Sequence, residues 1–304
     1  MVRNVKFSVV IPTRNREVPL TNLLSKILTQ TVLPCEVIVV DSSDNIHASY
    51  SEINKMVRYF YTNEKSAARQ RNLGMANVKK ETEVLFFLDD DTNPNTEYFE
   101  KMLNTLINNN AIGVSGLAIN PKKTRRVKPS GIRGFIKRIT FLDSKTDGKL
   151  LISGVAIPVR DKDSVIMETD WLIGCSCWNF QKIKWLRFEE DFVGYSLGED
   201  VIFSIQAKKF GKLLVNTDVL IDHFELPHVE TNIVQFNSMW VYNRFRIRKY
   251  LDRRSAFYFA FFLSTFARTI YTLTCLPKKP YVSAKQILGI TLGLIQIVRD
   301  TFKI

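Results

Sequence analysis

The sequence predicts an α/β fold, in which a mostly parallel sheet carries helices on both faces and a helical region follows at the C-terminus. Two patterns lead to this prediction. Over the first two-thirds of the chain, short apolar runs typical of strands alternate with amphipathic runs of helical spacing. Such alternation favours parallel strands, because each parallel connection must cross back over the sheet, usually as a helix. After about residue 230, long apolar and basic helical runs replace this pattern.

The expected elements can be placed in chain order. An apolar strand at residues 7–11 leads into an amphipathic helix at 20–28, and a second strand at 36–40 completes a β-α-β unit. The elements expected after this unit are a strand at 57–61, a helix at 66–78, a strand at 84–88, a helix at 96–107, a strand at 112–119, a helix at 200–210 and a strand at 213–221.

Polar and acidic residues follow three of these strands, at 13–16, 41–44 and 89–91. The carboxyl ends of parallel strands meet at one edge of a sheet, and ligands bind there, near the switch in strand order. Alternation along a strand predicts that Asp89 and Asp91 lie on the same side, where together they can hold a divalent cation and the phosphate that it carries. An alternative is that these acids begin a solvated turn and cap the next helix.

The chain is basic, with 43 Lys and Arg against 30 Asp and Glu and a formal net charge of +13. A surface of this sign attracts nucleic acid, phospholipid headgroups or phosphorylated substrates. No nucleic-acid motif is present, so nucleic acid is not an expected partner. The four cysteines have neither a CxxC spacing nor the density of a disulfide scaffold, which favours a reducing compartment. We expect Cys175 and Cys177 to lie in the core.

Five short motifs occur in the order and approximate spacing of one enzyme family. They are residues 8–16 (SVVIPTRNR), 39–44 (VVDSSD), 68–74 (ARQRNLG), 87–91 (FLDDD) and 198–200 (GED). Together they resemble family 2 glycosyltransferases with the GT-A fold over roughly residues 5–225, and five ordered motifs are much more specific than one. The resemblance implies the Rossmann-like GT-A fold and transfer of a sugar from a nucleotide-sugar donor, expected to be a UDP- or dTDP-sugar, with inversion at the anomeric carbon.

The resemblance also implies roles for individual residues. Asp91 resembles the family's ligand for Mn²⁺ or Mg²⁺, and His223 matches the position of a second metal ligand. Asp200 resembles the general base that takes a proton from the acceptor hydroxyl, and Glu199 a group that orients the acceptor. The positions that resemble nucleotide contacts are Pro12, Thr13, Arg14, Asn15, Asp41, Arg69, Asn72 and Asp89.

Some of these assignments have alternatives. Many family members have a second acid after the position of Asp41, and this chain has Ser42, which leaves the nucleobase open. His223 can also be an ordinary packed or surface histidine. The acidic pair at 199 and 200 can simply complement the dipole of the helix that it begins.

Two basic regions suggest contact with lipid. Residues 122–138 contain eight Lys and Arg and no acid, and we expect a mobile loop that grips a lipid-linked diphosphate or anionic headgroups, or is simply solvated. A helix is expected at 234–250, and an apolar run at 257–276 follows it with Arg268 in its middle. A spanning helix needs about 20 apolar residues, and a central arginine costs about 2.5–3.5 kcal/mol. This favours an interfacial helix, with residues 287–298 alongside it, over a core appendage.

We therefore expect a glycosyltransferase catalytic domain at residues 1–228 and a helical, membrane-associating region at 229–304. The expected acceptor is a saccharide or lipid-linked saccharide in cell-envelope polysaccharide synthesis. The expected location is cytoplasmic, peripheral on the inner face of the cell membrane. Two alternatives remain: a haloacid-dehalogenase-type phosphatase with Asp89 as its nucleophile, because Asp89, Asp91 and Thr92 resemble an Asp-x-Asp-x-Thr motif, or a non-catalytic basic membrane-binding protein.

Overall fold

Two units make up the described part of the chain. The computed structural model describes residues 4–45, 54–121, 128–160, 165–192, 196–224, 232–251 and 254–302. The first unit contains the described residues within 4–121, 159–192 and 199–224, and the second contains those within 128–158, 196–198 and 232–302. The domain boundary expected at residue 228 stays a prediction.

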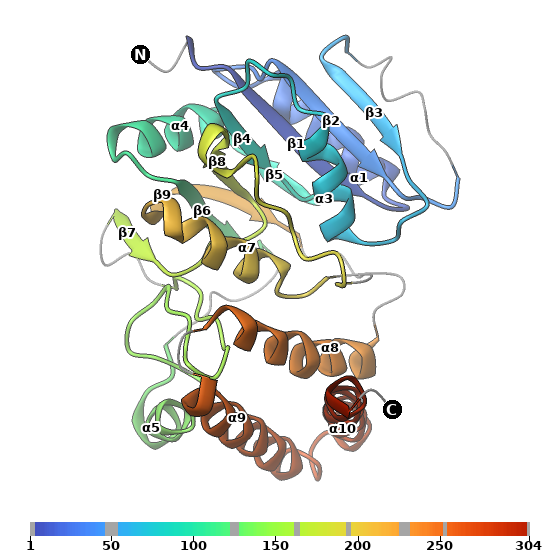
Figure 1. Ribbon diagram of the computed structural model, residues 1–304, viewed down its shortest axis with the longest axis vertical. Helices are drawn as coiled ribbons and strands as arrows, with labels where there is room; N and C mark the ends of the chain where they lie inside the picture. Colours follow the sequence, from blue (N-terminus) through green and yellow to red (C-terminus); the bar gives the residue numbers. More distant parts are fainter. Residues whose placement is uncertain are drawn as a thin grey trace. The chain divides into compact units, whose positions relative to one another are not determined.

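A sheet of nine described strands forms the centre of the first unit (Figure 1). The strands are β1 (Phe7–Thr13), β2 (Glu36–Asp41), β3 (Val57–Tyr61), β4 (Val84–Phe87), β5 (Thr92–Pro94), β6 (Gly113–Ile119), β7 (Ile166–Thr169), β8 (Ser176–Asn179) and β9 (Leu213–His223). Their order is β3-β2-β1-β4-β8-β6-β9-β5, and β7 also pairs with β9. The strands β3, β2, β1 and β4 are parallel, whereas β8 runs antiparallel between β4 and β6. The predicted α/β fold is confirmed.

Three of the strands have no counterpart in the sequence prediction. β5, β7 and β8 contain only three or four residues each and pair antiparallel with neighbouring strands. A run this short shows no readable alternation, so its strand conformation depends on the partner strand.

Helices cover both faces of this sheet, as predicted. They are α1 (Glu17–Leu28), α3 (Ala67–Ala76), α4 (Tyr98–Asn108), α6 (Phe180–Ile183) and α7 (Glu199–Ala207), with a 3₁₀ turn at Lys208–Phe210. α1 and α4 share one core cluster with Val9 of β1. The next residue, Val10, faces the other way, and a Cβ on Gly74 of α3 would lie 2.4 Å from its Cγ1. Phe203 of α7 packs edge-on to Phe87 of β4, with ring centroids 6.1 Å apart.

The strand order reverses at β1, which places the ligand-binding edge. β2 and β3 lie on one side of β1, and β4 lies on the other. In sheets of this kind ligands bind at the carboxyl ends of the strands at such a switch. Residues 14–16 follow β1 there, and residues 88–91 follow β4. The polar residues singled out in the sequence therefore lie along one edge.

The second unit is helical. Its elements are α5 (Gly131–Ile139), α8 (Ile233–Arg246), a 3₁₀ helix (Ile247–Tyr250), α9 (Arg254–Thr274) and α10 (Pro280–Phe302). The prediction of a loop at 122–138 is wrong for residues 131–138, because apolar side chains at helical spacing form α5 there. The basic residues 122–127 lie outside the described residues.

Two glycines allow α10 to approach α8 closely. A Cβ on Gly289 would lie 2.4 Å from the carbonyl oxygen of Val234, and a Cβ on Gly293 would lie 2.7 Å from that of Ser238. The GxxxG spacing of this helix therefore serves a contact within the chain. Within the described ranges, α10 is also the helix that is long and apolar enough to cross a membrane, judged by length and composition alone.

Two arginines enclose Trp240 in this unit. The guanidinium carbons of Arg244 and Arg268 each lie 3.9 Å from its ring centroid. Arg244 is buried and donates to Ser264 Oγ (3.0 Å), and Arg268 donates to Asn237 Oδ1 (2.8 Å). No carboxylate among the described residues pairs with either one, and burial lowers the pKa of both guanidinium groups.

Candidate active site

The three acids after β4 lie in a turn, and the turn rather than strand alternation sets their directions. β4 ends at Phe87, and the backbone N–H of Thr92 closes the turn by donating to the Asp89 carbonyl (3.2 Å). The carboxylate of Asp90 is buried and accepts hydrogen bonds from Thr13 Oγ1 (2.7 Å) and Arg16 Nη1 (2.9 Å). Burial raises the pKa of Asp90 to about 6, and Arg16 opposes this rise. Asp90 thus fixes the turn to the loop after β1.

Asp91 and His223 meet where β5 pairs with β9. Thr92 is the partner of His223, the last residue of β9. His223 Nε2 lies 3.1 Å from Asp91 Oδ1 and 3.7 Å from Asp89 Oδ2. Both predicted metal ligands are therefore brought together, with Asp89 beside them.

The donor set of this pair fits a divalent cation. Two neighbouring ligands of an octahedral ion, each at roughly 2.1 Å, lie about 3 Å apart, which is close to the separation of His223 Nε2 and Asp91 Oδ1. Among the described residues, no group of three His, Cys, Asp or Glu side chains makes a complete metal site. The arrangement therefore suits an ion that takes its other ligands from phosphate and water, and the imidazole favours Mn²⁺ over Mg²⁺.

Arg71 of α3 connects the acid turn to the first turn of α7. Its guanidinium is buried and donates to Asp89 Oδ1 (2.6 Å) and to Glu199 Oε1. The ring of Phe188 covers it, with the guanidinium carbon 5.6 Å from the ring centroid. On another side, a Cβ on Gly174 would lie 3.1 Å from Arg71 Nη2, so a side chain at this position would crowd the guanidinium.

Asp200 lies in the same turn of α7 as Glu199 and is half-buried. Burial raises the pKa of Asp200 to about 6, and the charge of Arg71 opposes this rise. Burial likewise raises the pKa of Glu199, again opposed by Arg71. A carboxylate whose pKa lies near neutrality is well matched to accepting a proton at physiological pH.

The loop after β1 is fixed to the loop after β2. Pro12 and Thr13 are the last residues of β1, and Asn15 has a left-handed backbone with φ of 53°, which asparagine tolerates well. Asn15 Nδ2 donates to Asp44 Oδ2 (2.8 Å), and the Asp44 N–H donates back to Asn15 Oδ1 (3.0 Å). Arg14 Nη2 lies 3.6 Å from Asp44 Oδ1.

Asp41 ends β2 and is buried, with both carboxylate oxygens oriented by neighbours. Oδ2 accepts from the Tyr59 hydroxyl (2.9 Å), and Oδ1 accepts from the Ser43 N–H (2.7 Å). Gln70 of α3 also joins β1 to β2, because its Nε2 donates to the carbonyls of Thr13 (2.7 Å) and Val40 (2.8 Å).

Arg69 and Asn72 hold a loop of the protein. The Asn72 amide donates to the Phe188 carbonyl (2.9 Å) and to Glu190 Oε1 (2.9 Å), and its oxygen accepts from the Phe188 N–H (2.8 Å). Arg69 Nε donates to the Glu190 carbonyl (3.1 Å). These contacts anchor residues 188–190 to α3, and the predicted nucleotide contacts of both residues stay predictions.

The sequence prediction missed Arg16, Gln70, Arg71 and Asp90, although all four lie within its motifs. The signal available in the sequence was the run of three polar residues Gln70, Arg71 and Asn72 inside an expected helix. The structure buries all three. A helix that buries three polar residues in a row has no purely apolar face, and buried polar groups need specific partners.

The aromatic and cysteine residues near this site belong to the core. Trp178 is buried, donates from Nε1 to Ser176 Oγ (2.9 Å) and packs edge-on to Phe203. Cys175 and Cys177 are buried in the core cluster, as predicted.

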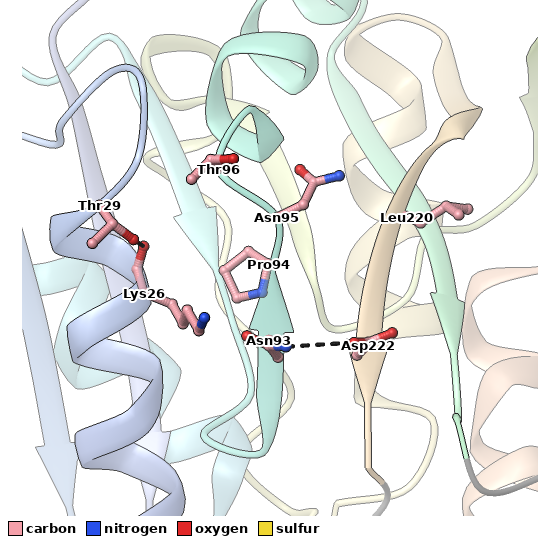
Figure 2. A pocket seen from close by; sticks show the side chains of 8 residues that line it. All are labelled: Lys26, Thr29, Asn93, Pro94, Asn95, Thr96, Leu220 and Asp222. Atoms are coloured by element: carbon pink, nitrogen blue, oxygen red, sulfur yellow. Dashed lines mark hydrogen bonds between the residues drawn. The ribbon is translucent and has the colours of Figure 1, made fainter.

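A separate hollow of about 340 Å³ lies beside β5 and β9 (Figure 2). Its lining residues are Lys26, Thr29, Asn93, Pro94, Asn95, Thr96, Leu220 and Asp222. Asn93 Nδ2 donates to Asp222 Oδ2 across it (3.4 Å). Because neighbouring residues of a strand point to opposite faces, Asp222 faces away from His223, and this hollow is distinct from the metal-ligand pair.

The fold resembles solved glycosyltransferase structures at low sequence identity. S. aureus TarS matches with a TM-score of 0.53 and 17% identity, over 94% of this chain and 54% of that one. TarS residues 1–349 in complex with UDP match with 0.54 and 15%, over 95% and 90% of the two chains. GalNAc-T7 with UDP, GalNAc and Mn²⁺ matches with 0.56 and 16%, over 83% and 51%. This chain thus spans about half the length of the full TarS chain. A comparison with curated proteins finds no match.

The sequence itself gives a more direct relationship. A family model described as glycosyl transferase family 2 matches residues 8–162, which is half of the chain. The matched range contains the loops after β1, β2 and β4 and the buried part of α3 that carries Arg71. The protein is a member of glycosyl transferase family 2 and has the GT-A fold.

Proposed function

We propose that this protein transfers a sugar from a UDP- or dTDP-sugar to a hydroxyl group of a saccharide or lipid-linked saccharide, with inversion at the anomeric carbon. One observation carries the proposal, which is the position of Asp89 between two groups of side chains. Its Oδ1 accepts from Arg71, which also holds Glu199, and its Oδ2 lies 3.7 Å from His223. A donor side and an acceptor side therefore meet at one carboxylate.

On the donor side, Asp91 and His223 are the residues that would hold Mn²⁺ or Mg²⁺. Such an ion acts as a Lewis acid that offsets the negative charge of the departing nucleoside diphosphate. Pro12, Thr13, Arg14, Asn15, Asp41, Arg69, Asn72 and Asp89 are the proposed surroundings of the nucleotide. The hydrogen bonds that fix Asn15 and Asp41 support this assignment, because a binding site needs its polar groups held in place before the ligand arrives.

On the acceptor side, we assign the general base to Asp200. As the acceptor oxygen forms its bond to the anomeric carbon, the bond from that carbon to the diphosphate breaks and its electron pair leaves with the diphosphate. Asp200 takes the proton of the acceptor hydroxyl, a contribution of typically about 10²–10⁴ in rate. Glu199 orients the acceptor, and Arg71 positions Glu199 and Asp89 relative to each other.

The second unit is proposed to keep the protein peripherally on the cytoplasmic face of a membrane, in cell-envelope polysaccharide synthesis. The length and apolar composition of α10 and the aromatic side chains exposed on α9 support this part of the proposal. A lipid-linked acceptor would be presented at the same surface.

Family membership favours this proposal over the phosphatase alternative.

Calorimetric titration with UDP, dTDP and GDP, with and without Mn²⁺, tests the donor site. We expect one nucleotide to bind in a Mn²⁺-dependent way and Asp91→Asn to weaken that binding by at least about tenfold. Asp222→Asn is the matched control, because Asp222 lies on β9, which pairs with β5, close to Asp91 in the fold, and faces the opposite side from His223. Absence of binding by every nucleotide, or equal losses in the two variants, would refute the proposed donor site.

A further inference from the structure

Helix α5 is short, amphipathic and unusually exposed. Its apolar residues Ile132, Phe135, Ile136 and Ile139 share one face by their spacing, and their side chains are 81%, 57%, 49% and 53% exposed. Large side chains exposed in one continuous stripe mark an interaction surface more often than isolated exposed residues do.

Apart from two glycines, the other residues of α5 are cationic. Arg133, Lys137 and Arg138 belong to a stretch, residues 122–142, that contains no Asp or Glu. An apolar stripe with cations beside it and no acids is the pattern of a helix that lies in the surface of an anionic bilayer.

The helix is attached to the rest of the second unit through α9. The Arg133 guanidinium carbon lies 5.0 Å from the centroid of the Tyr271 ring, and Arg133 Nη2 donates to the Tyr271 hydroxyl. α9 has a stripe of its own on the side away from its core contacts, made of Phe259, Phe262, Phe266, Ile270 and Leu273. Their spacing of three and four residues places them on one helical face, and each is at least 44% exposed.

Helix α10 repeats this arrangement. One face, with Gly289 and Gly293, packs on α8, while Leu288, Leu292, Ile295, Val298 and Phe302 stay exposed. No acidic residue occurs between residues 253 and 299, which include all of α9 and most of α10. The three exposed stripes thus share apolar and aromatic side chains, and Asp300 near the end of α10 is the one acid on these three helices.

We propose that α5 is a lipid-docking helix that inserts Ile132, Phe135, Ile136 and Ile139 among the headgroups of an anionic phospholipid bilayer, beside the exposed stripe of α9. This inference deepens the membrane part of the proposed function. It assigns the contact to a helix in the middle of the chain, so docking does not depend on the C-terminal helices alone. The charge of the surface selects anionic lipid as the occupant, because a second copy of this chain would bring like charges together.

Flotation of the full chain with vesicles tests this inference. Vesicles of phosphatidylglycerol with phosphatidylcholine are compared with vesicles of phosphatidylcholine alone. We expect the protein to bind the anionic vesicles. The double variant Ile132→Ser, Phe135→Ser should lower its partition coefficient at least about tenfold, because each of these apolar side chains lowers the free energy of binding when it leaves water. Lys137→Gln with Arg138→Gln should lower it by roughly fivefold for each cation, on anionic vesicles only.

Trp185→Ser is the matched control. Trp185 is 75% exposed but belongs to the first unit. Its replacement therefore removes a large exposed apolar side chain and leaves α5 unchanged. Vesicle binding equal to that of the unchanged chain in both α5 variants would overturn the inference. So would a dimer in sedimentation velocity that dissociates in the Ile132→Ser, Phe135→Ser variant, because the stripe would then be a protein interface.

Nucleotide titration of the same variants separates this inference from the proposed enzymatic activity. We expect the α5 variants to bind nucleotide as the unchanged chain does, which also shows that they fold. A chain that floats with vesicles through α5 but binds no nucleotide would refute the proposed transferase site and leave the docking helix supported.

Discussion

Replacement of Arg71 by methionine removes the one cation that Asp89 and Glu199 share. Methionine keeps a long, flexible stem but cannot donate to either carboxylate. Both ion pairs are buried on the arginine side, and removal of one partner from a buried pair typically costs about 3–5 kcal/mol. We expect a loss of stability of this size, because Glu199 is left buried without a counter-charge.

The same replacement changes the protonation of the acids. The charge of Arg71 lowers the pKa of Asp200 and of Glu199, so its removal raises both. The acid limb of kcat/KM should therefore move upward from about pH 6, by roughly one unit for every 1.4 kcal/mol of lost interaction. In the methionine variant, the native state binds more protons than the unfolded state at pH values between the ordinary carboxyl pKa and the raised pKa values. The stability deficit should consequently grow as pH rises through the raised pKa values and shrink as pH falls.

Urea unfolding at about pH 5 and about pH 8, together with a pH–rate profile, measures both effects. Arg71→Lys is the control, because it keeps the charge but loses the two-pronged geometry of the guanidinium. We expect it to retain the acid limb near its original pH. A methionine variant with the same stability at both pH values and an unmoved acid limb would refute the coupling between these residues.

Three further outcomes follow from the geometry. In the unaltered chain, kcat/KM should fall about tenfold per pH unit below about pH 6, since Asp200 must be unprotonated to act as a base; a flat profile down to about pH 4 would contradict this. Gly293→Val should cost about 1–3 kcal/mol in urea unfolding, because its Cβ would lie 2.7 Å from the Ser238 carbonyl oxygen, and an unchanged midpoint would show that α10 does not pack there. Trp240→Leu should cost about 2–4 kcal/mol through loss of packing and of two partly buried cation–π contacts. Arg268→Gln should cost less, since it relieves repulsion with Arg244, and the reverse ranking would disprove this view of the cluster.

The sequence predicts the position of the binding edge because that edge depends on local patterns. Apolar runs fix where β1, β2 and β4 end, and the polar residues that follow them need only the parallel topology to converge. The fold class, the helices on both faces and the buried cysteines follow from the same patterns.

The internal connections of the site are not encoded locally. Arg71 meets Glu199 across 128 positions of sequence, and Asp91 meets His223 across a strand pair that includes the three-residue strand β5. Neither the apolar period nor the turn signals describe such contacts. The turn at Asp89 likewise replaces the strand alternation expected there, because the Thr92 N–H bonds to the Asp89 carbonyl.

Helix α5 was hidden by its composition. Its cations and its glycines, Gly131 and Gly134, are typical of a solvated loop, and the apolar residues between them form a face that no core covers. The spacing of Ile132, Phe135, Ile136 and Ile139 is itself a clear helical signal, and the sequence prediction gave more weight to the basic, glycine-containing composition than to this spacing.

In the proposed reaction, Asp200 removes the acceptor proton at a site where Asp91 and His223 support the donor. Mass spectrometry of saccharide and lipid-linked saccharide acceptors incubated with Mn²⁺ and a panel of UDP- and dTDP-sugars tests this reaction, with the unaltered chain beside Asp200→Asn. We expect an acceptor heavier by one sugar with the unaltered chain. We also expect a rate about 10²–10⁴ lower with Asp200→Asn, which should still bind the nucleotide in calorimetry. Transfer at equal rates by the two proteins would contradict the assignment of the base, and bound nucleotide with no product from any donor would contradict sugar transfer itself.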